Sequence, residues 1–105
     1  MIARIWHGWT THENADVYYQ VLTETVIPQI ESYKMEGYRK IEVLRQELED
    51  ETEFITIMYF DSLELIKQFV GDDYETAHVP EVAQKVLKRW DKRSQHYEVK
   101  DSFSY

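Results

Sequence analysis

Cysteine is absent from this chain of 105 residues, which also holds only three glycines and two prolines. Without cysteine the chain forms no disulfide, thiolate nucleophile or thiolate metal site, and this composition fits a reducing compartment. Gly8, Gly37 and Gly71 are too far apart to form a phosphate-binding loop. No catalytic triad or paired-carboxylate site is apparent, so the sequence gives no support to the common hydrolase classes.

Positive charge and long apolar runs are also scarce. Twelve basic residues stand against 20 acidic ones, which gives a formal net charge of -8. A surface of this sign repels phosphate backbones and gains nothing from anionic lipid, so we expect no nucleic-acid binding and no membrane association. No apolar stretch approaches the roughly 20 residues that span a bilayer, and no signal peptide is apparent. We therefore expect a cytoplasmic protein.

Aromatic residues are abundant instead. They make up 14% of the chain, with eight tyrosines and three tryptophans, and the hydrophobic fraction is 43%. This composition excludes a disordered chain, and the length with no obvious linker predicts a single domain over residues 1–105. Aromatic rings bury a large area per side chain, which suits both a small core and a partner interface.

Hydrophobic spacing predicts the secondary structure. Four stretches are dense in β-branched and aromatic residues or alternate in polarity, which is typical of strands, and three carry apolar residues at helical spacing. We expect a kink at Pro28, and Asp61 and Glu64 form a capping-box-like pair. The predicted strands are residues 2–9, 38–48, 54–60 and 94–101, and the predicted helices are residues 13–33, 61–70 and 80–91.

The order β-α-β-β-α(α)-β predicts an α+β, ferredoxin-like fold, a four-stranded antiparallel sheet with helices on one face. The other face is then uncovered, although both faces of the first strand carry bulky apolar groups. Because a bare apolar sheet face needs a cover, we expect a homodimer. One face of this strand carries Ile2, Arg4, Trp6 and Gly8, and the other carries Ala3, Ile5, His7 and Trp9.

Six segments resemble the antibiotic-biosynthesis-monooxygenase-like branch of the dimeric α/β-barrel superfamily. The resemblance covers nearly the whole chain and implies a homodimer with sheets packed face to face as a dimeric α/β barrel. It also implies a cavity between sheet and helices in each subunit, and oxygen insertion into a small aromatic or quinol without metal or flavin, so no cofactor is expected. The segments are MIARIWHGWTT, VIPQI, GYRKIEVLR, FITIMYFDSLELIKQF, DDYETAHVPEV and RSQHYEV.

The resemblance also implies site residues. It directs the face of His7 and Trp9 toward the cavity, where His7 would be the base that deprotonates a phenol, because imidazoles exchange protons near neutral pH. His78 would be a second acid/base or an axial haem ligand. Trp9, Phe60 and Tyr18 would line the cavity and bind the substrate. The alternative for each is a structural role in the core, at a cap or at the interface.

Haem-degrading relatives in this superfamily use an asparagine, a tryptophan and a histidine that fall by position on His7, Phe60 and His78. Only the histidine is retained, so the resemblance does not favour haem degradation, although haem binding through His78 stays open. The four histidines show no helical i, i+4 pair, so no metal site is expected. The competing function is a non-catalytic dimeric barrel that binds a small hydrophobic ligand or haem.

Alternation places Trp6 on the opposite face from His7, and we assign Trp6 to the dimer interface. Arg4 shares the Trp6 face, and there it would need an acidic partner across the interface. Arg39 and Arg45 could anchor an anionic substituent, although a solvated strand face is the simpler interpretation.

Overall fold

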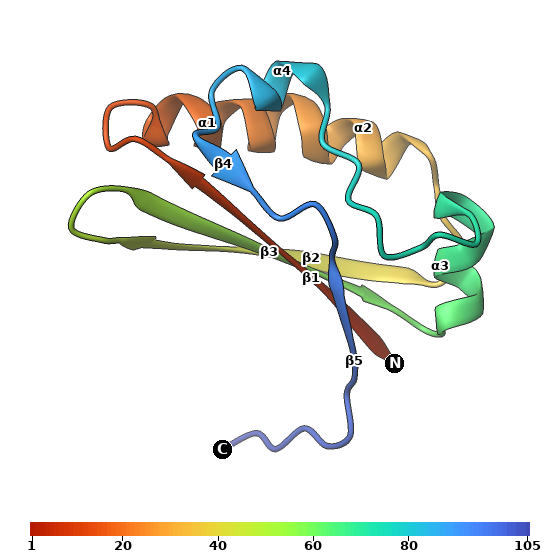
Figure 1. Ribbon diagram of the computed structural model, residues 1–105. Coiled ribbons are helices and arrows are strands. Elements are labelled where there is room, and N and C mark those ends of the chain that lie inside the picture. The colour runs from red at the N-terminus through yellow and green to blue at the C-terminus, as the bar shows by residue number, and fades with distance from the viewer.

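The computed structural model describes all 105 residues as a five-stranded antiparallel sheet with every helix on one face (Figure 1). The strand order is β2-β3-β1-β4, and β5 also pairs with β1. This confirms the α+β, ferredoxin-like arrangement. The strands are β1 (Ile2–Thr10), β2 (Tyr38–Glu47), β3 (Thr52–Phe60), β4 (Arg89–Trp90) and β5 (Gln95–Glu98). The helical segments are α1 (Ala15–Val21), η1 (Leu22–Val26), α2 (Ile27–Ser32), α3 (Leu63–Val70) and α4 (Glu81–Gln84).

The fourth strand is split, which the sequence did not predict. β4 and β5 pair with the same edge of β1, and residues 91–94 between them leave the ladder. Thr76 forms a bridge with Arg93, and the Ser94 amide donates to the carbonyl of Glu75 at 2.6 Å. The segment before α4 is therefore attached to the sheet at this interruption.

The predicted helix over residues 80–91 is wrong beyond its first turn. α4 spans only four residues, because the chain then joins the open edge of β1. The Lys88 amide donates to the Trp9 carbonyl at 2.7 Å, and Trp90 pairs with Gly8. A strand edge needs hydrogen-bond partners, and this need overrides the helical spacing of the apolar residues.

The first helix runs over α1, η1 and α2, and the change before Pro28 is a π-helical segment. Proline lacks an amide hydrogen and its ring clashes with the carbonyl four residues earlier, so wider turns at η1 accommodate it. α3 is capped by Ser62, whose hydroxyl accepts from the Leu65 amide at 3.4 Å. Asp61, expected at this cap, pairs instead with Arg39.

The layer between sheet and helices is divided into two halves. One half is a packed core in which the rings of Tyr18 and Phe54 meet edge to face at 4.9 Å. The other half, toward α2 and α3, is hollow. The buried core consists of Ala15, Tyr18, Leu22, Phe54, Ala83 and Leu87.

Gly8 leaves room for the indole of Trp6, whose Nε1 donates to the Asp91 carbonyl at 3.0 Å. A Cβ at position 8 would lie 2.5 Å from this ring. We expect Gly8→Ala to lower the free energy of unfolding by about 1–3 kcal/mol through overpacking, measured by urea denaturation. Trp6→Phe should relieve the penalty in the double variant, and additive effects of the two substitutions would contradict this account.

Candidate ligand cavity

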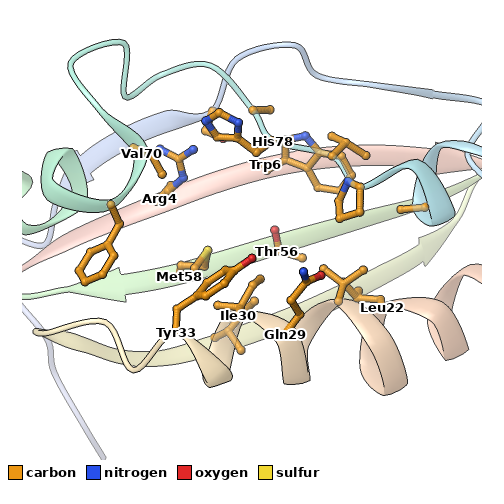
Figure 2. Close-up of a pocket in the computed structure, with 18 of the residues that line it drawn as sticks. Arg4, Trp6, Leu22, Gln29, Ile30, Tyr33, Thr56, Met58, Val70 and His78 are labelled. Atoms are coloured by element: carbon orange, nitrogen blue, oxygen red, sulfur yellow. The ribbon is translucent and has the colours of Figure 1, made fainter.

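The hollow half of the layer is a cavity of about 980 Å³ that is partly open to solvent. Sixteen of its 23 lining residues are hydrophobic, and none is acidic. Figure 2 shows Arg4 and His78 on one wall, with Gln29 and Ile30 of α2 and Tyr33 just beyond its last residue facing them. The floor is the sheet, with Trp6, Thr56 and Met58. An apolar cavity with a few polar groups is typical of a small-molecule site.

Strand register decides which residues face this cavity. Arg4 lies opposite Met58 and Trp6 lies opposite Thr56, so these four side chains share the face that the helices cover. His7 lies opposite Ile55, on the other face. The expectation that His7 and Trp9 point into the cavity is therefore wrong.

Assignment of Trp6 to the dimer interface is wrong for the same reason. Trp6 lines the cavity, and so does Arg4. Both strand faces carry bulky residues, so alternation separates two groups of side chains without indicating which group meets the helices.

Three of the five predicted site residues line the cavity, namely Tyr18, Phe60 and His78. Tyr18 and Phe60 are buried, whereas His78 is exposed at the rim. Burial raises the pKa of Tyr18, so its hydroxyl stays protonated across the physiological range. Tyr18 can therefore contact a ligand but cannot be its base at neutral pH.

Arg4 is the unexpected feature of the site. Its side chain is only 8% exposed, and no carboxylate forms a salt bridge with it. Nη1 donates to the Tyr74 carbonyl and to Nε2 of His96 at 2.8 Å, and Nη2 donates to the Thr76 carbonyl at 3.3 Å. Burial lowers the pKa of this guanidinium. The partner-chain carboxylate expected for Arg4 has no place here, because Arg4 does not face the open side of the sheet.

His96 is the neutral partner of Arg4. Since arginine only donates, Nε2 of His96 must accept, and the ring proton then lies on Nδ1. Nδ1 is buried and has no hydrogen-bond partner. Burial first, and the charge of Arg4 second, lower the pKa of His96 to about 4. The pair therefore carries one uncompensated positive charge at the cavity wall.

Arg39 and Arg45 do not belong to this site. Arg39 pairs with Asp61, and Arg45 pairs with Asp16 at 2.8 Å, all at the molecular surface. Both side chains are exposed, but Arg45 lies on the helix-covered face of the sheet, because it stands opposite Phe54 and pairs with Asp16 of α1.

The open face of the sheet carries His7 and Trp9, which the family resemblance had directed toward the cavity. His7 Nδ1 lies 2.9 Å from Glu53, its ring stacks on Trp9 at 5.9 Å, and Arg89 lies 3.9 Å over the Trp9 ring. Apolar residues share this face with the cluster, and all the helices lie on the opposite side of the sheet (Figure 1). These apolar residues are Ile5, Leu44, Ile55, Ile57, Tyr59 and Tyr97.

Sequence reasoning missed Tyr33, Gln29 and His96 as well as the role of Arg4. The polarity of the second strand could have shown which face of β1 meets the helices. Lys40 and Glu42 on one face of that strand indicate solvent, while Ile41 and Val43 on the other indicate the helix side. Ile41 lies opposite Met58, which in turn lies opposite Arg4.

The chain is thus an α+β protein with a ligand-sized cavity between its sheet and its helices. A solved structure from Bacillus cereus, described as a putative antibiotic biosynthesis monooxygenase, is similar to it over 99% of this chain and 95% of that chain. The TM-score is 0.68 and the sequence identity is 16%. No protein-family model and no curated protein matches the chain. The likeness confirms the fold that the sequence resemblance implied.

Two further observations concern other kinds of site. No group of three or more histidine, aspartate or glutamate side chains is arranged to hold a metal ion. None of the helices combines the length and apolarity needed to cross a bilayer.

The low pKa of His96 makes stability depend on pH. Between its folded-state pKa of about 4 and the ordinary 6.5, the unfolded chain binds more protons at this residue, so stability falls as pH falls through that window. We expect the melting temperature of the wild type to drop more between pH 7 and pH 5 than that of His96→Gln.

His12, whose pKa is raised by the Glu49 carbonyl and by Glu47, acts in the opposite direction but equally in both proteins. Their difference therefore isolates His96, and equal drops in melting temperature would contradict the assignment.

Proposed function

We propose that the protein is a cofactor-independent monooxygenase acting on a small phenolic or quinol substrate held in the cavity. The observation that carries this proposal is a cavity of about 980 Å³ with apolar walls and an imidazole at its rim. The fold it shares with the Bacillus cereus protein supports the assignment. Because fold alone does not define function, the proposal depends on the site.

In this reaction His78 accepts the proton of the substrate hydroxyl, which leaves an electron-rich anion. The anion transfers one electron to dioxygen, and the resulting radical and superoxide combine into a peroxide anion at the reactive carbon. His78 then returns its proton to give the hydroperoxide. Loss of water then leaves a carbonyl, so a CH2 group and O2 become C=O and H2O. Ring contacts with Trp6 and Met58 would hold the substrate flat and exclude water from the charged intermediate.

Oxygen uptake with 1,8-dihydroxyanthrone tests this function. We expect His78→Gln to lower kcat by about a hundredfold, since removal of a general base has this order of effect. His7→Gln is the matched control, because His7 lies on the opposite sheet face, and it should retain full activity. Equal losses in both variants, or no loss in His78→Gln, would overturn the role of His78.

The competing function is a non-catalytic protein that binds a small hydrophobic ligand or haem. The same apolar walls would bind such a ligand, so only a measurement of turnover distinguishes this binder from the oxygenase. Ligand-induced thermal stabilisation without oxygen uptake would favour this binder.

We also propose that a second copy of the chain covers the open sheet face. An interface around a two-fold axis must be self-complementary, and this face offers an apolar centre with charges of both signs. Lys40 lies 3.9 Å from Glu42 at one end, and Arg89 lies near Glu53 at the other. Within one chain these apolar side chains have no cover, which favours association.

Ile57→Glu should therefore produce a monomer at micromolar concentration, measured by light scattering, because a charge would be buried at the centre of the interface. Val17→Glu is the matched control, since Val17 is 46% exposed on α1 and lies away from the sheet. A wild-type monomer, or a dimer of Ile57→Glu, would exclude this interface.

A further inference from the structure

Charge is distributed unevenly between the surface and the cavity. The chain has 20 acidic residues and a formal net charge of -8, yet no acidic residue lines the cavity. Arg4 is the only permanently charged lining residue. The interior of the site is therefore positive in a protein that is otherwise negative.

Arg4 has donors that the protein does not use. A guanidinium carries five N–H groups, and three protein acceptors contact Nη1 and Nη2 of Arg4. Nε and one hydrogen of Nη2 have no protein acceptor. All three acceptors are uncharged, since two are backbone carbonyls and the third is the neutral ring of His96. The positive charge of Arg4 is therefore left without a counter-charge.

The carboxylates on the segment that holds Arg4 are engaged elsewhere. Arg93 contacts Glu75 at 2.8 Å and Asp73 at 3.4 Å, and the Thr76 hydroxyl also donates to Asp73. These groups lie on the segment whose carbonyls hold Arg4, but their charges are paired at the surface. Burial of an unpaired charge is costly, so this arrangement favours an anionic ligand.

We propose that Arg4 pairs with a carboxylate of the bound molecule, so that the cavity takes a planar aromatic carboxylate. The planar fork of an arginine matches a carboxylate with two parallel hydrogen bonds. Trp6 and Met58 on the sheet and Ile30 on α2 supply the apolar surfaces for the ring. The inference rests on the proposed use of this cavity as the ligand site, and it adds the substrate class.

Two isosteric probes test it. The affinity of 2-naphthoate and of neutral 2-naphthamide is measured by calorimetry on the wild type, and we expect the carboxylate to bind roughly ten- to a hundredfold more tightly. Arg4→Met should abolish this preference, and Arg4→Lys should retain part of it. Arg39→Met removes the same charge from the surface and should behave as the wild type.

Equal affinity for the two probes, or an unchanged preference in Arg4→Met, would overturn the inference. Should Arg4→Met fail to fold, the wild type alone decides: the NMR resonance of the Arg4 Nε–H must shift with 2-naphthoate and not with 2-naphthamide. A shift with neither probe would also overturn it.

These outcomes are separable from those of the oxygenase test. Arg4-dependent binding of 2-naphthoate without oxygen uptake from any phenol would remove the proposed reaction and keep the carboxylate site. Oxygen uptake with equal binding of the two probes would keep the proposed reaction and remove the carboxylate site. If neither probe binds, the carboxylate site is excluded, and oxygen uptake alone then decides the reaction.

Discussion

Backbone pairing along β1 is the constraint on which the other features depend. β3 pairs with one edge of this strand, and β4 and β5 pair with the other. Successive side chains of a strand point to opposite faces, so the same nine residues supply both the cavity floor and the open face. Arg4 and Trp6 face the helices, while Ile5 and His7 face outward. A shift of one residue in this register would exchange the two surfaces.

The order of strands and helices could be predicted from the sequence because each element has its own hydrophobic period. The sequence did not allow a prediction of which face of β1 meets the helices. A right-handed crossover decides which side of a sheet a helix covers, but it does not decide which alternate residues point there. Pairing with β3 and β2 contains that information, since Phe60 lies opposite Ile2 and therefore on the Arg4 face.

The chemistry of the site was predictable only in part. Tyr18, Phe60 and His78 were predicted as site residues through the family resemblance, and all three line the cavity. Arg4 was expected to meet a carboxylate because a buried charge needs a partner. A lone arginine in a strand does not reveal the neutral acceptors that surround it. These acceptors come from residues 70 to 92 positions away in the sequence. Such contacts depend on tertiary structure and leave no local pattern.

Interruption of the fourth strand also determines how the cavity wall is built. The carbonyls of Tyr74 and Thr76 accept from Arg4 because this irregular segment makes only the single Thr76–Arg93 bridge and forms no continuous strand. Two backbone hydrogen bonds tie this segment to the strand edge, from the Ala77 amide to the Lys92 carbonyl at 2.9 Å and from the Ser94 amide to the Glu75 carbonyl at 2.6 Å. Segments held so sparsely open locally at far lower cost than whole-domain unfolding. Transient detachment of this wall would therefore enlarge the cavity mouth while the sheet stays intact.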